Sequence, residues 1–235
     1  MEAVHDAAYK GDLAEIQRLI TGDPSLIERL GDNGYNVLMI ASQHGQHHVA
    51  EWLVDNGSDV EAKDKYGHTS LHLACICCQA ETAALLLRKG ADVNKTCTPR
   101  AETPLIFACN AGNKETVKAL LSHPGLLIDH QEIRGWTALW RGVHRNRPEA
   151  TELMLAAGAD PRIARDDGMI PLDCARNEGH AECVALLEVS EPARKTEIEI
   201  FFFLPPRLRL YAVLHSLALS LLPTYPIHLF IHRQL

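Results

Sequence analysis

The sequence contains no excess of basic residues. Its 235 residues include 23 Lys and Arg against 30 Asp and Glu, which gives a formal net charge of −7 at pH 7. Residues 192–235 alone carry +3, so the rest of the chain carries −10. Because neutralising phosphates requires Lys and Arg in excess, a nucleic acid is not the expected partner.

The sequence also lacks the motifs of common catalytic sites, with no Gly-x-Gly-x-x-Gly and no phosphate-binding loop followed by lysine. One cluster resembles a metal site or a nucleophilic site, and it consists of His68, His72, Cys75, Cys77 and Cys78. A zinc ion needs four converging ligands, but Cys77 points away from the helix face that His72 and Cys75 share. A nucleophilic enzyme needs an ordered base and oxyanion donors, which the sequence does not supply. We therefore expect no enzymatic activity, catalytic residues, metal, cofactor or small-molecule substrate.

The seven cysteines lack the regular spacing of a disulfide framework, and their number is odd. No apolar leader follows Met1, because residues 2–12 are mostly polar. Both features favour a reducing compartment. We therefore expect the chain in the cytoplasm or the nucleus.

A five-residue motif recurs at intervals of 33 or 34 residues along the chain. A small residue follows each motif leucine by three positions, and an apolar run comes later in each copy. The segment Val4–Ala7 fits the same frame, so the chain has six copies. The motifs are Gly34-Tyr-Asn-Val-Leu38, Gly67-His-Thr-Ser-Leu71, Ala101-Glu-Thr-Pro-Leu105, Gly135-Trp-Thr-Ala-Leu139 and Gly168-Met-Ile-Pro-Leu172.

Each copy carries the signals of two short helices. Thr69, Thr103 and Thr137 precede apolar helical runs, where a hydroxyl can accept a hydrogen bond from an unpaired backbone N–H. Pro104 and Pro171 occupy first-turn positions, where the missing N–H costs nothing. Because helices this short are marginal alone, they must bury their apolar faces against neighbouring copies.

This pattern resembles the ankyrin repeat, whose signature is Gly-x-Thr-Pro-Leu-His-x-Ala with a period of 33. The third copy is nearest, and His72 is its motif histidine, whose ring nitrogens the resemblance assigns to tying the helix start to the neighbouring loop. The resemblance implies an all-α ankyrin-repeat solenoid of six helix-turn-helix repeats joined by β-turn or hairpin loops. The predicted repeats are 1–33 (an N-terminal cap), 34–66, 67–100, 101–134, 135–167 and 168–188.

The resemblance further implies a non-catalytic scaffold or adaptor that binds a protein partner in a concave groove. Loop tips and exposed positions of each first helix are expected to line this groove. The fifth copy is unusual because it is crowded with Trp and Arg, the residue types that often dominate interface energies. An alternative is that its tryptophans fill gaps between helices. The candidate partner-binding residues are Tyr66, Arg100, Arg134, Trp140, Arg141, His144 and Arg145.

Asn94 closes the Asp-Val-Asn turn of the third copy. In ankyrin-like proteins an asparagine at this place can be hydroxylated by an oxygen-dependent hydroxylase. The resemblance therefore makes Asn94 a candidate hydroxylation site, and the alternative is an ordinary turn residue.

The C-terminal segment does not belong to the repeats. Residues 189–197 are predicted to be a polar linker, and residues 198–235 a hydrophobic, basic tail. No formally charged residue occurs from Leu210 to Ile231, a length that just crosses a bilayer, so residues 208–231 could tether the chain to a membrane facing the cytosol. Two histidines and two prolines weaken this hypothesis. A self-associating or amphipathic tail, a segment packed on the last repeat, and a chance extension are alternatives.

A weaker hypothesis concerns a ubiquitin-ligase adaptor box, because such boxes follow ankyrin repeats in one family. The spacing of the apolar residues and proline in Leu210–Leu214 and Leu222-Pro223 resembles that of the box, but the cysteine of the box is absent. The corresponding function would be a substrate-recruiting subunit of a ubiquitin ligase.

Overall fold

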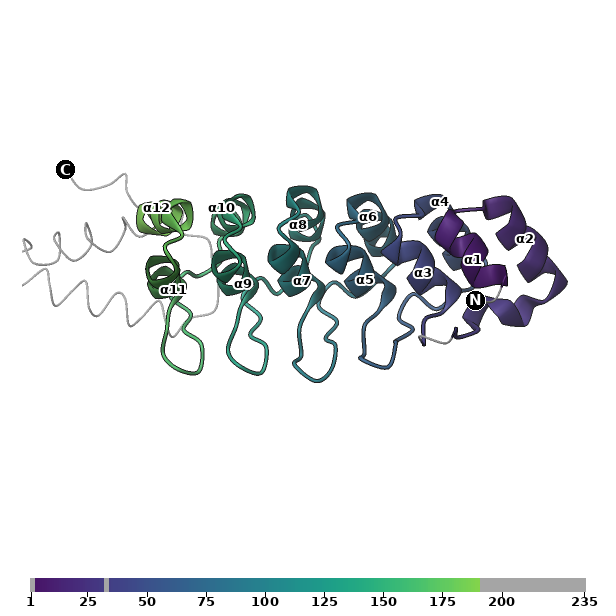
Figure 1. Ribbon diagram of the computed structural model, residues 1–235, viewed down its shortest axis with the longest axis horizontal. Coiled ribbons are helices and arrows are strands. Elements are labelled where there is room, and N and C mark those ends of the chain that lie inside the picture. The colour runs from purple at the N-terminus through teal and green to yellow at the C-terminus, as the bar shows by residue number, and fades with distance from the viewer. Residues whose placement is uncertain (1–2, 32–33, 191–235) are drawn as a thin grey trace, which may run out of the picture. The chain divides into compact units, whose positions relative to one another are not determined.

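The computed structural model describes residues 3–31 and 34–190. Within these ranges the regular structure is entirely helical and consists of twelve α-helices and one short 3-10 helix. The α-helices form six consecutive pairs stacked side by side, with a long loop between successive pairs (Figure 1). The predicted all-α ankyrin solenoid is confirmed for this part of the chain. The predicted tail, and the linker beyond Ser190, lie outside the described residues.

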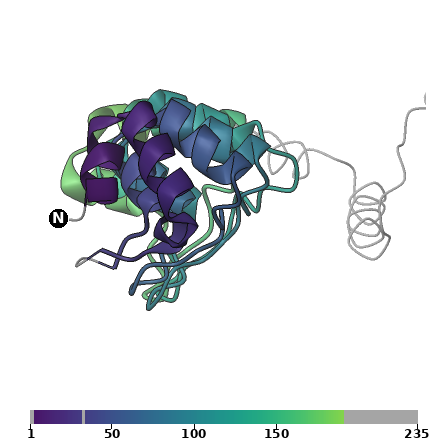
Figure 2. The same ribbon diagram turned by 90° about the vertical axis from the view of Figure 1, so that its right-hand side faces the viewer.

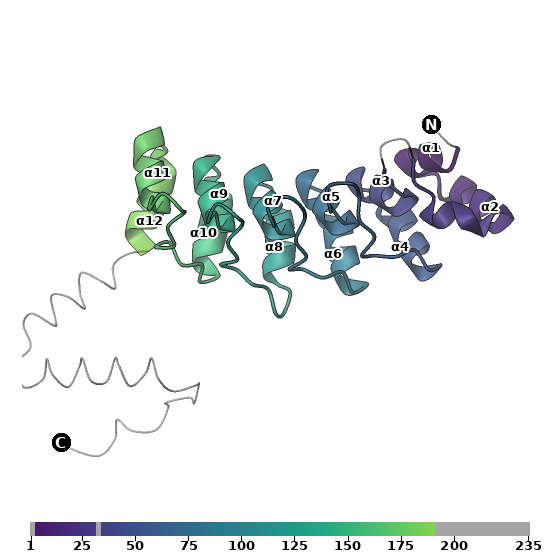
Figure 3. The same cartoon turned by 90° about the horizontal axis from the view of Figure 1, so that it is seen from below.

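We call the first helix of each pair the inner helix and the second the outer helix. Figure 3 shows the inner helices in one row and the outer helices in the row beside it. The pairs are α1 (Ala3–Lys10) with α2 (Leu13–Gly22), α3 (Val37–Gln43) with α4 (His47–Asp55), α5 (Ser70–Ile76) with α6 (Ala80–Arg88), α7 (Pro104–Ala111) with α8 (Lys114–Leu121), α9 (Ala138–His144) with α10 (Pro148–Ala156), and α11 (Pro171–Glu178) with α12 (Ala181–Ser190). The 3-10 helix, η1 (Pro24–Glu28), follows α2.

The inner helices begin where the sequence predicts. Thr137 caps α9, and its hydroxyl oxygen accepts a hydrogen bond from the backbone N–H of Trp140 at 3.2 Å. Thr69 caps α5, whereas Thr103 occupies the cap of α7 without a side-chain hydrogen bond. Pro104 opens α7 at a position where no intrahelical N–H is needed.

Small side chains allow neighbouring inner helices to approach closely. Ala41, Ala74, Ala108 and Ala175 are completely or almost completely buried at equivalent positions of α3, α5, α7 and α11. The motif leucines are buried beside them, and burying a leucine side chain contributes roughly 1.5–3 kcal/mol. Since each pair hides its apolar face against the next pair, stability comes from stacking.

The loops between pairs all extend to one side of the helices, as the view along the stack shows (Figure 2). Backbone hydrogen bonds join the tips of neighbouring loops. The Thr98 N–H donates to the Tyr66 carbonyl at 2.9 Å, and the Ile133 N–H donates to the Arg100 carbonyl at 3.0 Å. The Asp166 N–H donates to the Arg134 carbonyl at 3.3 Å. The loops that carry Tyr66, Arg100, Arg134 and Asp166 therefore form one continuous layer.

Within the ranges above, none of the helices has the length and apolar character that crossing a bilayer requires. The predicted tether, residues 208–231, lies outside them.

Candidate protein-binding surface

Three predicted partner-binding residues form a row along the loop tips. Tyr66, Arg100 and Arg134 hold the same position in three consecutive loops, each five residues before a motif leucine. The backbone hydrogen bonds between neighbouring loops involve the carbonyl groups of these same residues. All three side chains are exposed, Tyr66 to 50%. We call these residues the tip row.

The two arginines of the tip row are not neutralised by carboxylates. Among the described residues, neither the Arg100 nor the Arg134 side chain has an ion-pair partner. Nearby carboxylates are engaged elsewhere, because Glu132 accepts the backbone N–H of Arg134 at 2.7 Å and Glu102 pairs with Arg141 at 2.7 Å. The cationic groups of the tip row are therefore available to an anionic partner.

The C-terminal ends of the inner helices supply a second set of exposed side chains. Tyr9 on α1 is 50% exposed, and Ile76 on α5 is also exposed. Arg145 follows α9 and donates from Nε to the Asn110 side-chain oxygen at 2.9 Å. The positive charge of Arg145 interacts favourably with the negative, C-terminal end of the α9 dipole. Arg145 is one of the predicted partner-binding residues. Tyr9 and Ile76 lie on first helices, whose exposed positions are expected to line the groove.

Trp140 is not available to a partner, which corrects its prediction as a partner-binding residue. Its side chain is only 1% exposed, and its ring N–H donates to the Met169 carbonyl at 3.2 Å. Trp140 stands at the position of the motif histidine. In the third repeat His72 hydrogen-bonds the carbonyl of Glu102 in the next loop at 3.3 Å. The tryptophan thus replaces the histidine bond, and the alternative that it fills a gap between helices holds.

Arg141 is also buried, so its prediction as a direct contact is wrong. It is 8% exposed, and its Nη2 donates to the Glu102 carboxylate at 2.7 Å. Its guanidinium carbon lies 4.1 Å from the centre of the Trp136 ring. Burial lowers the pKa of Arg141, while Glu102 and Glu132 oppose that effect. The residue joins the fourth and fifth repeats beneath the surface.

His144 is half-buried against the aromatic side chains of the fifth repeat. Its ring meets that of Trp136 edge to face, with centroids 5.0 Å apart, and the Cys174 sulfur lies 3.8 Å from its Nδ1. Burial, and then the charge of Arg145, lower the pKa of His144, so the ring is neutral at pH 7. His144 therefore adds a neutral aromatic surface beside Arg145.

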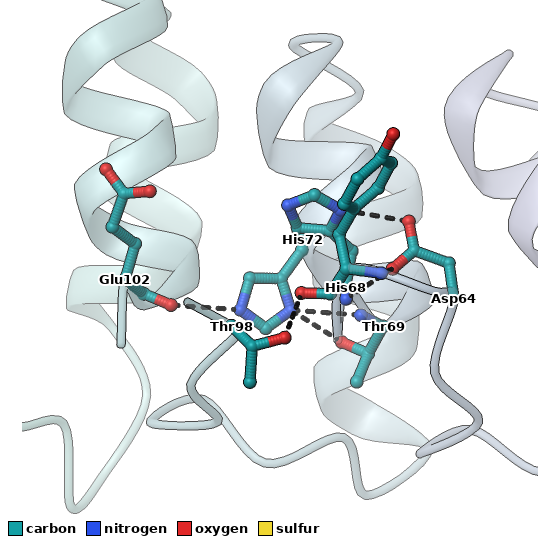
Figure 4. Close-up of polar contacts among 7 residues, drawn as sticks. Asp64, His68, Thr69, His72, Thr98 and Glu102 are labelled. Carbon is teal, nitrogen blue, oxygen red and sulfur yellow. Dashed lines mark hydrogen bonds and ion pairs between the residues drawn. The ribbon is translucent and has the colours of Figure 1, made fainter. Parts of the chain in front are cut away.

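The loop that carries Tyr66 is held by a buried polar network (Figure 4). The Asp64 carboxylate accepts the backbone N–H groups of Tyr66 and His68, both at 2.8 Å, and contacts the His68 ring at 2.9 Å. On the other side, the Thr98 hydroxyl donates to the Tyr66 carbonyl at 2.9 Å. The position of Tyr66 is therefore set before any partner arrives.

His72 connects this loop to the next one, the role that the resemblance implies. Its Nδ1 accepts the Thr69 N–H at 3.1 Å, so the proton must reside on Nε2, which faces the Glu102 carbonyl (Figure 4). Burial lowers the pKa of His72 to about 4, and the ring is neutral at pH 7. Within the described ranges, no three His, Cys, Asp or Glu side chains are grouped so as to hold a metal ion.

The side chain of Asn94 hydrogen-bonds the backbone of the next repeat. Its oxygen accepts the Leu127 N–H and its amide donates to the Gly125 carbonyl, both at 2.8 Å. Glu28, Glu61 and Asp129 make corresponding bonds to backbone N–H groups one repeat further on. Hydroxylation of Asn94, which stays a prediction, would require the loop to release these bonds.

The stacked helix pairs, the protruding loops and the histidine bridge define a helical repeat solenoid. The family model for ankyrin repeats (three copies) matches residues 4–97 and 94–165. The chain is therefore a member of the ankyrin-repeat family. Its repeats match a solved ankyrin repeat domain from Acinetobacter baumannii with 32% identity and a TM-score of 0.70, covering 80% of this chain and 96% of that one.

Other relatives show how widely the repeats are used. The ankyrin repeat protein YahD of Escherichia coli is 28% identical, over 77% of this chain and 92% of YahD. Human inversin is 29% identical over 83% of this chain, and the Caenorhabditis elegans homolog of transient receptor potential cation channel subfamily A member 1 is 28% identical over 74% of it. The chain spans only 18% and 14% of those two proteins. Ankyrin repeats generally mediate protein–protein interaction.

A likeness of fold alone links the chain to one solved complex. A chain from the complex of a predatory endopeptidase with an immunity protein, from Bdellovibrio bacteriovorus, has a TM-score of 0.71 and 24% identity. The match covers 80% of this chain and 97% of that one.

Proposed function

We propose that this protein is a non-catalytic scaffold or adaptor, and that its tip row and Arg145 bind an acidic segment of a protein partner. The observation that carries the proposal is the alignment of Arg100 and Arg134 on hydrogen-bonded neighbouring loops without carboxylate partners in the described part of the chain. Family membership supports a binding role, because ankyrin repeats generally act in protein–protein interaction.

Preorganisation favours binding at this surface. The loop tips are already joined through their backbones, and Asp64 and Thr98 hold Tyr66 in place. A partner therefore loses little affinity to the ordering of the receptor. On the outer side of the fifth repeat, exposed Glu149 and Glu152 repel an acidic segment from α10.

The proposal is tested by selecting displayed random peptides on the full-length protein. The same selection is repeated on a variant with Arg100→Ala, Arg134→Ala and Arg145→Ala, which we call the inner-surface variant. A matched control carries Arg88→Ala, Lys114→Ala and Lys118→Ala, which remove the same number of charges from the outer helices α6 and α8. Circular dichroism checks that all three proteins are folded.

We expect the wild-type protein and the control to enrich peptides containing Asp and Glu, and the inner-surface variant to lose that enrichment. A protein that enriches no peptides would contradict the proposed binding role. Equal enrichment by all three proteins would show that the partner binds elsewhere.

We also propose a cytoplasmic or nuclear location. The support is that all seven cysteines are free thiols, and that burial raises the pKa of Cys109 to about 12, which keeps it unreactive. Fractionation of cells expressing the full chain tests this proposal. Recovery in the membrane pellet would favour the alternative, a tether through residues 208–231. That tether and the ubiquitin-ligase hypothesis both depend on residues outside the described ranges.

A further inference from the structure

The exposed residues of the tip row and of the inner-helix ends change in character along the stack. The early repeats expose aromatic or aliphatic residues, namely Tyr9 near the end of α1, Tyr66 at the tip of the loop before α5, and Ile76 at the end of α5. Further along the stack, the tip position of Tyr66 is taken first by Arg100 and then by Arg134, and Arg145 follows α9. The surface therefore has an apolar zone followed by a cationic zone.

The cationic zone ends at the loop before α11. The tip position of that loop is occupied by Asp167, whose carboxylate pairs with Arg165, and the position equivalent to Arg145 is the exposed Glu178 on α11. The carboxylates that follow thus confine an acidic ligand to the part of the surface that carries Arg100, Arg134 and Arg145. The ligand residue that precedes this acidic part lies over Tyr66, which holds the tip position one loop before Arg100.

The spacing of the repeats sets the spacing of the side chains in the ligand. Neighbouring packed helices lie about 8–10 Å apart. A polyproline II segment advances roughly 9 Å in each turn of about three residues, so every third side chain points the same way. Such a segment presents one side chain to each repeat, and little ordering entropy is lost because unfolded chains often adopt this conformation.

We propose that the surface recognises an extended protein segment with one apolar residue and carboxylates about three and six residues from it. The apolar residue packs on Tyr66, the nearer carboxylate pairs with Arg100, and the farther one pairs with Arg134. This inference rests on the proposed function and specifies the chemistry of the partner.

The test uses fluorescein-labelled synthetic peptides and the full-length protein at low salt, followed by fluorescence anisotropy. One peptide has a leucine and glutamates about three and six residues away in a Pro/Ser background. The other peptides have the same composition with the glutamates adjacent, at a helical spacing of about seven and fourteen, or replaced by Gln. Each spacing is made with the leucine first and with it last, and a single-stranded oligonucleotide serves as an additional probe.

We expect the three-and-six spacing, in one of the two orders, to bind most tightly. Arg100→Ala should weaken that peptide about two- to fivefold, as expected for one exposed ion pair, and should not affect a peptide with Gln at the nearer position. Arg134→Ala should act in the same way at the farther position. Lys114→Ala on α8 is the matched control and should change neither affinity.

Equal affinity for all spacings, tightest binding at the helical spacing, or equally tight binding of the oligonucleotide would overturn this inference. So would the absence of binding by any designed peptide at about 1 mM, a concentration that reveals even weak complexes. These failures are separable from failure of the proposed function, which the peptide selection tests without assuming any spacing.

Discussion

Acidification should lower the free energy of unfolding of the repeats through protonation of His72. The size of the loss follows from the buried environment of the His72 ring. The ring is buried and neutral, with Nδ1 accepting the Thr69 N–H and Nε2 facing the Glu102 carbonyl. Burial lowers the pKa of His72 from 6.5 to about 4. The unfolded chain therefore takes up the proton first as the pH falls. The stabilisation is complete above about pH 6.5 and is lost as the pH falls toward 4.

The magnitude follows from the difference between the two pKa values of His72. Integrating the proton uptake gives a loss of about 3 kcal/mol by pH 4. His72→Gln is the reference variant, because glutamine does not titrate in this range and can still accept the N-terminal N–H of α5. Urea unfolding of both proteins, followed by circular dichroism in steps from pH 7 to pH 4, measures the effect.

The stability advantage of the wild type over His72→Gln should shrink by about 3 kcal/mol across this range. Carboxylates that titrate over the same range affect both proteins and cancel in the difference. Parallel stability curves would refute the inference that His72 is held neutral by burial.

Three further predictions concern individual residues. Cys78 has a φ of 61° at a position where most other repeats have glycine. Cys78→Gly should therefore stabilise the protein by about 0.5–1 kcal/mol in urea unfolding, and Asn146→Gly should stabilise it by less. A loss of stability would contradict this prediction. Trp140→Phe should cost about 1–2 kcal/mol, because the carbonyl of the half-buried Met169 loses its donor. Peptide binding should remain, and weakened binding in the folded variant would reverse the correction. If Asn94 is a hydroxylase substrate, peptide mass spectrometry will show one added oxygen on it; an unmodified residue leaves it an ordinary turn residue.

Local signals in the sequence, together with the resemblance to the ankyrin repeat, predicted the fold. Thr69, Thr137 and Pro104 mark the starts of inner helices through chemistry that acts within one turn, and the structure has helices starting there. The small residue recurs in every copy, and the motif leucine recurs in all but the first, where Val4 takes its place, so each copy can pack against the next in the same way. Short-range rules of this kind do not depend on what the neighbouring repeat contains.

The binding site was harder to predict, because the solvent exposure of each side chain depends on residues of the neighbouring repeat. Arg141 is buried because Glu102, 39 residues earlier, provides its carboxylate partner. Trp140 is buried because its ring N–H reaches the carbonyl of Met169 in the next loop.

The most direct test of the proposed binding surface is the affinity of one selected acidic peptide for three proteins. These are the wild type, the variant lacking Arg100, Arg134 and Arg145, and the outer-helix control lacking Arg88, Lys114 and Lys118. We predict a loss of at least about tenfold for the inner-surface variant, the combined effect of three exposed ion pairs, and less than about twofold for the control. Equal losses in the two variants would mean that net charge, rather than this surface, holds the ligand, and would contradict the account.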